Sequence, residues 1–269
     1  MKIAMFTNLY LPMVGGVAIS VERFSRAYRA RGHEVLIVAP EFPDQPGNEE
    51  NVHRIRALQN FNGTDFSVAL PPGHELSHCL DVFSPELIHS HHPFLLGDAA
   101  VRAATHRGLP LVYTHHTMYE YYSHYVPLDS KLLRNFVIEL STRYTEFCNL
   151  VISPSESVEE ILRERGVTCP IAIVPTGVET ESFASGSRER GREKVGLDPE
   201  CKVVGHIGRL AVEKNLDFLT CSVIRAMREM ESSRFLVVGS GDMEESMRQR
   251  LIQQGLEDRA VFAGTRTGQ

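Results

Sequence analysis

Several common signals are missing from this sequence, and each absence excludes a class of protein. The five cysteines among the 269 residues are scattered and form no C-x-x-C pair, which argues against a zinc ribbon or a disulfide scaffold and fits a reducing cytosol. No run of eighteen apolar residues occurs, so the sequence predicts no membrane-spanning helix. The opening residues, MKIAMFTNLYLP, lack the extended apolar core of a signal peptide. We expect a cytoplasmic protein, with attachment to the inner face of the cell membrane left open.

Signatures of several enzyme classes and of nucleic-acid binding are also missing. The net charge of −6 argues against nucleic acid as a partner. The G-x-G-x-x-G fingerprint of dinucleotide-binding proteins is absent. Neither a G-x-S-x-G nucleophile elbow nor a prominent pair of carboxylates is present, which disfavours a hydrolase. What the sequence does contain is a regular alternation of apolar runs and amphipathic segments.

The first two thirds of the chain predict a doubly wound α/β domain over residues 1–180. Its apolar runs are continuous rather than alternating, which is typical of strands in a parallel sheet covered on both faces. The amphipathic segments between them predict crossover helices. Strands are expected at 2–8, 34–40, 87–91, 109–116, 150–155 and 171–177, and helices at 17–32, 95–108 and 155–166, where Ser155 can cap.

The alternation restarts in residues 181–269 after a polar stretch at 179–200, which predicts a linker with one short helix. Three strands and two helices are about half of a doubly wound domain. We therefore expect a truncated second domain or a partner along its open edge, with a small complete domain as the alternative. Strands are expected at 202–210, 234–241 and 260–265, and helices at 215–230 and 242–255.

A glycine pair, Gly15 and Gly16, separates the first expected strand from the first expected helix. Glycines there allow backbone N–H groups to approach a ligand closely, and a helix N-terminus favours anions. The pair therefore predicts an anion site, while a tight turn without a ligand explains it equally well.

Two cations follow a strand of the second domain in the stretch GHIGRLAVEKN. Arg209 and Lys214 would lie at the carboxyl end of that strand, where doubly wound folds bind ligands. The planar fork of arginine and the point charge of lysine together suit a diphosphate. Glu213 beside them is interpreted as a solvated surface charge.

A third glycine turn, VVGSGDMEE, ends the next strand of the second domain. Gly239 and Gly241 either shape a nucleotide pocket or form a plain turn in which Asp242 caps the following helix. The sequence leaves both interpretations open.

Histidines gather at the ends of two neighbouring strands. His89, His91 and His92 follow one expected strand, and His115 and His116 end the next. Because side chains alternate along a strand, His115 and His116 cannot both face one site. These histidines lack the tight ligand spacing of a metal centre, so we expect no metal here. They predict the wall of a cleft instead.

The segment SKLLRNFVIELSTRYTEF, residues 130–147, predicts a further helix with both apolar and basic positions. An ordinary helix that faces the core is the favoured interpretation. Because Lys131, Arg134 and Arg143 accompany the apolar positions, docking on an anionic lipid surface is the alternative.

Six short motifs occur along the chain in a fixed order: P-x-x-G-G-V at 12–17, RGHEVLIVAP at 31–40, IHSHHPF at 88–94, THHT at 114–117, VPTGVE at 174–179 and GRLAVEKN at 208–215. The ordered set resembles the retaining, nucleotide-sugar-dependent glycosyltransferases of family GT4. That resemblance implies the GT-B fold, in which two Rossmann-like domains face a cleft. Residues 1–180 would be the acceptor domain, and residues 181–269 an incomplete donor domain. The stretch 114–127 is most similar to enzymes that glucosylate diacylglycerol.

The resemblance also implies roles for individual residues. Arg209 and Lys214 match the basic pair that holds the donor diphosphate, and Gly16 matches the glycine whose backbone approaches the same phosphates. The resemblance implies a nucleotide diphosphate sugar as donor, with UDP-glucose favoured. We expect neither a cofactor nor a metal, because the two cations would stabilise the departing charge. The expected donor-binding residues are Gly15, Gly16, Arg209, Lys214, Gly239 and Gly241.

On the acceptor side, His116 matches the family's histidine near the donor sugar and the acceptor, and it is expected to be catalytic together with Arg209 and Lys214. Tyr119, Tyr122 and His91 are the expected acceptor-binding residues. The resemblance also implies a mechanism: the acceptor attacks from the same face without an enzymic nucleophile, and the leaving phosphate accepts the proton of the acceptor hydroxyl.

The sequence departs from the family pattern at two places, and three hypotheses about its function remain open. Thr176-Gly177-Val178-Glu179 stands where the family often has Asn-Gly-Val-Asp, and the family's paired glutamates, eight residues apart, have no counterpart in 202–269. We expect those glutamates beyond Gln269. The hypotheses are a hexosyltransferase that acts on a membrane lipid such as diacylglycerol, one that acts on a soluble sugar or small molecule, and an inactive fragment that binds nucleotide sugar.

Overall fold

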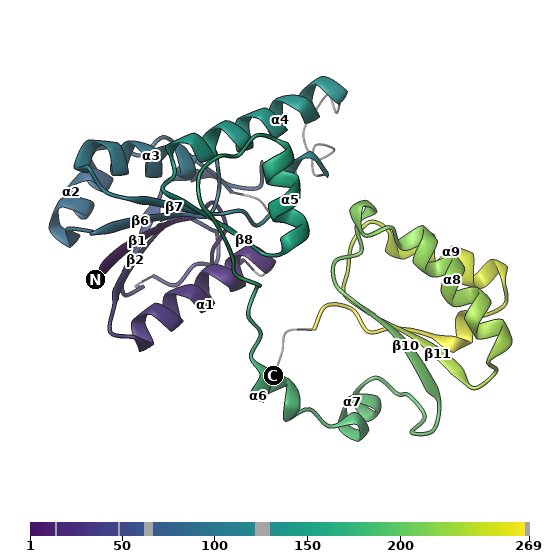
Figure 1. Ribbon diagram of the computed structural model, residues 1–269. Helices are drawn as coiled ribbons and strands as arrows, with labels where there is room; N and C mark the ends of the chain where they lie inside the picture. Colours follow the sequence, from purple (N-terminus) through teal and green to yellow (C-terminus); the bar gives the residue numbers. More distant parts are fainter. Residues whose placement is uncertain (14, 48, 62–66, 122–129, 267–269) are drawn as a thin grey trace. The chain divides into compact units, whose positions relative to one another are not determined.

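The computed structural model of this protein describes residues 1–269 except residues 14, 48, 62–66, 122–129 and 267–269. The chain divides into two compact units, Met1–Val178 and Glu179–Gln269, which we call unit 1 and unit 2 (Figure 1). The division lies close to the expected boundary at residue 180. Each unit has a parallel sheet and a hydrophobic core of its own, and each is described by itself.

Unit 1 is built on one seven-stranded sheet in which all neighbouring strands run parallel. Phe6 at the end of the first strand pairs with Val38 on one side and Ser90 on the other, so these strands end close to one another. The carboxyl edge of the sheet therefore gathers the loops that follow them. The order across the sheet is β3 (Val52–Ile55), β2 (Glu34–Pro40), β1 (Lys2–Phe6), β6 (Leu87–Ser90), β7 (Leu111–Thr114), β8 (Leu150–Ser153) and β9 (Ile171–Ile173).

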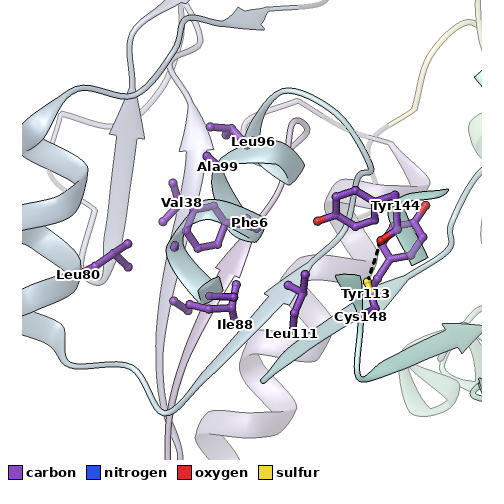
Figure 2. Close-up of a cluster of buried hydrophobic side chains, with 14 of the residues drawn as sticks. Phe6, Val38, Leu80, Ile88, Leu96, Ala99, Leu111, Tyr113, Tyr144 and Cys148 are labelled. Carbon is purple, nitrogen blue, oxygen red and sulfur yellow. Dashed lines mark hydrogen bonds between the residues drawn. The ribbon is translucent and has the colours of Figure 1, made fainter. Parts of the chain in front are cut away.

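The two faces of this sheet have separate cores because successive strand residues point to opposite sides. Met5 packs with Val21 of α1 (Gly16–Ala30) on one face. Phe6 packs with Leu80 and Ile88 on the other (Figure 2). Figure 1 shows α1 on one face and α2, α3 and α4 on the opposite one. The helices that contribute to the second core are α2 (His74–Phe83), α3 (Leu96–Arg107), α4 (Lys131–Tyr144) and α5 (Glu156–Glu164).

Some elements of unit 1 differ from the sequence-based expectation. The strand β3, the helix α2 and a hairpin of β4 (Ala57–Leu58) and β5 (Val68–Ala69) were not expected, because their short apolar patterns follow no clear period. The strand β7 ends at Thr114, two residues before the expected end at 116. The expected cap of α5 is confirmed: Ser155 Oγ accepts from the backbone N–H of Val158 at 3.3 Å.

Unit 2 begins with α6 (Thr180–Ala184) and α7 (Arg188–Lys194), so the expected linker holds two short helices rather than one. The strands β10 (Lys202–Ile207), β11 (Ser233–Val238) and β12 (Ala260–Phe262) then form a parallel sheet in that order. Its core includes residues of β11, of α8 (Leu216–Glu229) and of α9 (Glu244–Gln253). The expected three strands and two main helices are confirmed. Ile207, at the end of β10, is 82% exposed.

Candidate functional site

A buried network around Asn8 holds the loops at the carboxyl edge of the sheet in unit 1. The side chain of Asn8 donates from Nδ2 to the carbonyl oxygen of Phe94 at 3.0 Å. Its Oδ1 accepts from the backbone N–H of Leu96 at 3.1 Å, where α3 begins. The backbone N–H of Asn8 donates to Nδ1 of His92 at 3.1 Å. Because the first N–H groups of a helix have no partners within it, Asn8 caps α3 from the end of a distant strand and fixes the loop after β6.

Three histidine rings lie in a row on the α1 face at the same edge. His89 pairs in register with Met5, whose side chain packs with α1, and the ring of Phe24 from α1 lies 5.7 Å from that of His89. His91 lies two residues further along, and its ring centroid is 4.2 Å from that of His89. His91 Nδ1 is 2.9 Å from Nε2 of His116, at hydrogen-bond distance. The structure thus brings together two histidines from the ends of neighbouring strands.

His115 and His116 lie in different surroundings. Both residues follow the end of β7, so the alternation of side chains within a strand does not explain why their side chains face different neighbours. The backbone N–H of His115 still donates to the carbonyl oxygen of Ile152 at 2.9 Å, and its ring lies 6.0 Å from that of Tyr113. His116 turns instead to His91. His115 is buried and His116 is half-buried.

Burial keeps the histidines of this edge uncharged. Desolvation, together with a smaller contribution from the neighbouring His116, lowers the pKa of His89 and of His92 to about 3. Desolvation also lowers the pKa of His115 and of His116 to about 4. The pKa of His91 falls well below its usual value for the same reason, with His89, His116 and His92 adding to the effect. Near neutral pH these rings therefore act as neutral hydrogen-bonding groups.

The expected acceptor residues have different exposures. His91 is fully buried, so its expected direct contact with an acceptor is corrected: its ring is bonded to His116 instead. Tyr119 is half-buried, its ring lies 5.0 Å from that of Phe94, and its hydroxyl is buried without a hydrogen-bond partner in the described residues. The buried hydroxyl of Tyr119 is therefore not placed for direct contact with an acceptor in this structure. Tyr122 lies outside the described residues.

An ion pair anchors the segment that carries Tyr119. Arg165, just after α5, donates from its guanidinium to Oε1 of Glu120 at 2.6 Å. Both side chains are largely shielded from solvent, which strengthens such a pair relative to one on the surface. The pair was not expected from the sequence because its partners lie 45 residues apart.

The glycine pair at the start of α1 has free space where side chains would lie. Gly15 has extended backbone, with φ of −166°, and Gly16 is the first residue of the helix. A side chain built at either position would meet no atom within 4 Å in the described structure. Internal packing therefore does not require glycine at these two positions, and the space beside the helix N-terminus could take a ligand.

In unit 2, Arg209 is held by an acidic neighbour. Its guanidinium lies 2.7 Å from Oε1 of Glu213, whose side chain is 7% exposed, whereas that of Arg209 is 45% exposed. Glu213 belongs to the 3-10 helix Val212–Lys214. The interpretation of Glu213 as a solvated surface charge was therefore wrong. A shielded carboxylate can orient the exposed guanidinium, and Lys214 is exposed in the same loop.

Gly239 and Gly241 are required by the fold of the loops themselves. Both have positive φ, of 141° and 149°. A Cβ at Gly239 would lie 1.9 Å from the carbonyl oxygen of Gly208, and one at Gly241 would lie 2.4 Å from that of Leu210. The expected cap at Asp242 is corrected, because Met243 is the N-cap of α9 and no side chain of the described residues caps this helix. The glycine turn lets the loop after β11 pass directly against the loop that carries Arg209.

The expected site residues thus fall into two sets, one in each unit. Within unit 1, His91 and His116 meet. Within unit 2, the loop of Arg209 and Lys214 lies against the glycine turn, where the backbone N–H of Leu210 donates to the carbonyl oxygen of Ser240 at 2.8 Å. Sequence reasoning missed Glu213 as a partner, although its spacing of four from Arg209 was a usable signal.

One further histidine spacing lies outside the expected site. His74-Glu75-x-x-His78 has the H-E-x-x-H pattern, in which two histidines on one face of a helix bind zinc. It opens α2, and all three side chains are exposed. In the described part of the chain, no group of three or more His, Cys, Asp or Glu side chains is placed to hold a metal ion. The pattern here forms a solvated helix face.

The helix α4 exposes an apolar stripe. Leu132 is 79% exposed and Phe136 60%, and Leu140, a further turn along, is also exposed. The favoured expectation of a core-facing helix is therefore wrong for this stripe, although Tyr144 near the helix end is buried.

Over the described residues, no helix is both long and apolar enough to cross a membrane.

Known proteins resemble this chain over nearly its whole length. An alpha-monoglucosyldiacylglycerol synthase of Streptococcus pneumoniae is 25% identical over 98% of the chain. A GDP-mannose-dependent alpha-mannosyltransferase of Mycobacterium tuberculosis is 27% identical over 99% of the chain and 68% of its own length. The chain spans 61% of the length of the Streptococcus protein, less than two thirds.

The solved structures agree on the fold. The crystal structure of an Anabaena protein in complex with UDP and glucose matches 100% of this chain and 70% of its own, with a TM-score of 0.70 and 18% identity. The expected α/β architecture of the GT-B class is thereby confirmed. The model of Glycosyltransferase Family 4 matches residues 14–182, more than half of the chain. The protein belongs to glycosyltransferase family 4.

Proposed function

We propose that this protein transfers a hexosyl group from a nucleotide diphosphate sugar to an acceptor hydroxyl, with retention of configuration. UDP-glucose is the proposed donor. The observation that carries the proposal is Arg209 at the carboxyl end of β10, oriented by the shielded Glu213 and accompanied by Lys214. Family membership supplies the reaction class.

The chemistry of such a transfer matches this arrangement. As the bond between the sugar and the diphosphate breaks, negative charge grows on the departing phosphate oxygens. A cation whose position is already fixed stabilises that charge more than it stabilises the ground state, which is the condition for rate acceleration. Glu213 restrains Arg209 before the donor binds, so less ordering is left to the reaction step. No metal or cofactor is part of this proposal.

The exposed stripe of α4 supports a lipid acceptor, such as diacylglycerol, at the inner face of the cell membrane. Leu132, Phe136 and Leu140 recur every four residues and share one side of the helix. Lys131 and Arg134 are exposed on the other side of the same helix. A helix with an apolar stripe on one side and cations on its polar side can lie on an anionic lipid surface. The likeness to a diacylglycerol-glucosylating synthase points the same way.

Transfer assays test the proposal directly. Purified protein would be supplied with UDP-glucose or GDP-mannose, and with diacylglycerol in vesicles or a soluble sugar as acceptor. We expect glucosylated lipid with the α-configuration, formed equally well in the presence of EDTA. Product from a soluble sugar alone would replace the lipid acceptor. Loss of transfer on adding EDTA would contradict the metal-free reaction.

Vesicle sedimentation tests the acceptor side separately. We expect Leu132→Glu with Phe136→Glu to reduce binding to vesicles rich in anionic lipid about tenfold or more, because two large apolar groups no longer enter the membrane interface. Val82→Glu is the matched control, since Val82 is a 72% exposed apolar residue on α2. Equal binding by both variants would remove α4 from the proposal.

A further inference from the structure

The buried contact between His91 and His116 indicates which nitrogen of each ring carries a proton. The two rings share one hydrogen bond, His91 Nδ1 to His116 Nε2, at 2.9 Å. One nitrogen must donate and the other must accept, so a single proton lies between two neutral rings. Each neutral imidazole carries one N–H. The direction of this hydrogen bond therefore fixes the tautomer of both histidines.

The second nitrogen of His91 decides the direction. His91 is fully buried, and its Nε2 has no hydrogen-bond partner in the described part of the chain. If His116 donated the shared proton, His91 would carry its own proton on Nε2, as a buried N–H without an acceptor. Buried N–H groups without partners are rarer than under-satisfied acceptors. The favourable arrangement leaves Nε2 as a bare lone pair and places the proton of His91 on Nδ1.

This arrangement determines the tautomer of His116. When its Nε2 accepts from His91, its own proton must sit on Nδ1, the nitrogen that is not bonded to His91. His116 is half-buried, while His91 behind it is sealed by the rings of His89 and Phe24 at 4.2 Å and 6.1 Å. The backbone of His91 is held in place as well, since its N–H donates to the carbonyl oxygen of Phe6 at 2.9 Å.

We propose that His91 is a positioning residue that fixes His116 as the Nδ1–H tautomer, so that His116 meets its substrate as a neutral hydrogen-bond donor. This deepens the proposed function and rests on it for the identity of the substrate. A neutral N–H on Nδ1 suits an oxygen of the donor sugar or of its phosphate. It does not suit removal of a proton from the acceptor hydroxyl, because the nitrogen that would take that proton is already occupied.

The tautomer can be measured without any substrate. Two-bond proton–nitrogen correlation spectra of the ¹⁵N-histidine-labelled protein separate protonated from bare ring nitrogens, and the signals lost in His116→Ala identify that residue among the twelve histidines. We expect a protonated Nδ1 and a bare Nε2 in His116. A protonated Nε2 in His116 would overturn the inference. This measurement on the unaltered protein decides the matter even where variants of His91 do not fold.

Variants of His91 then test the positioning role. His91→Leu keeps an apolar side chain but supplies no hydrogen bond, whereas His91→Asn offers an amide N–H near the position of Nδ1. We expect His91→Leu to give a mixture of His116 tautomers and to lower kcat about tenfold or more with KM for the acceptor little changed, since one hydrogen bond to the reacting substrate is weakened. His91→Asn should restore the single tautomer and much of the rate.

The outcomes separate this inference from the proposed function. An unchanged tautomer and an unchanged kcat in folded His91→Leu would show that His91 does not position His116. The expected tautomer in a protein that transfers no sugar would leave the assignment of His116 standing and would remove the proposed function instead.

Discussion

Arg209 shows how one neighbouring residue changes the meaning of a surface cation. Its guanidinium is nearly half exposed, which alone would suggest an ordinary surface arginine. The carboxylate of Glu213, almost fully shielded, holds that guanidinium at 2.7 Å and so limits its orientations. An arginine restrained in this way loses less entropy when it binds a phosphate, because part of its freedom is already gone.

We expect Arg209→Ala to lower sugar transfer by about a hundredfold or more while the protein stays folded. The reason is the loss of a positioned charge at the departing diphosphate. Turnover with UDP-glucose and the circular dichroism spectrum would be compared with those of Arg225→Ala, an exposed arginine of α8 that serves as the control. Unchanged turnover in Arg209→Ala would remove the diphosphate assignment.

The buried histidines make stability depend on pH in a defined direction. Burial lowers the pKa of His89 and of His92 to about 3 in the folded protein, below the value of about 6.5 for an unfolded histidine. The unfolded state therefore binds more protons below pH 6.5. The stabilisation is fully present above that pH and is lost as the pH falls towards 3.

We accordingly expect unit 1 to become less stable between pH 7 and pH 5. Each of these two buried histidines would contribute a loss of about 2 kcal/mol over that range. Urea unfolding, followed by the signals of unit 1 at several pH values, measures the change. A free energy of unfolding that is the same at pH 5 and pH 7 would mean that these rings are not held neutral.

At the scale of elements, the glycine turns that look alike in sequence differ in physical role. Gly16 opens α1 with free space around its Cα, whereas Gly239 has φ of 141° and passes against the backbone of Gly208. The first could accept a methyl group within the described structure. The second could not, because both the backbone conformation and the close contact exclude a Cβ.

This difference gives a paired prediction. Gly239→Ala should destabilise unit 2 by several kcal/mol, as strained backbone and an atomic overlap combine. Gly16→Ala should leave the unfolding transition unchanged or raise its midpoint slightly, since alanine favours a helix more than glycine does. It should weaken binding of the donor about tenfold if phosphates approach this backbone. Thermal unfolding and UDP titration separate the two effects, and tight UDP binding by Gly16→Ala would place the phosphates elsewhere.

At the scale of the whole molecule, the two units have independent cores. Unit 1 buries apolar residues on both faces of its seven-stranded sheet, and among the described residues the cores of its two faces contain none of unit 2. The core of unit 2 is likewise built from its own strands and helices. A domain with a complete core of this kind can fold by itself.

We therefore expect residues 1–178, expressed alone, to unfold in one cooperative transition in urea. The histidine ring signals of this fragment should match those of the whole chain, since the row of His89, His91 and His116 lies within unit 1. A fragment that shows no cooperative transition would mean that unit 1 depends on unit 2 for its stability.

The sequence by itself determined the architecture. Continuous apolar runs separated by amphipathic segments predicted both parallel sheets and most of their helices, because the period of the apolar residues follows directly from the geometry of strands and helices. The order of its motifs also indicated the family before any contact was known. Elements with short or irregular apolar patterns, such as α2 and β3, had no comparable signal.

Only the tertiary structure decided what the individual polar residues do. The sequence placed His91 and His116 at the ends of neighbouring strands. It could not show that His91 is fully buried behind His116, or that one of its nitrogens has no partner among the described residues. It likewise interpreted Glu213 as a surface charge and the α4 stripe as part of the core. Burial and hydrogen bonding depend on atoms brought together from distant parts of the chain, and no local pattern of residues records that neighbourhood.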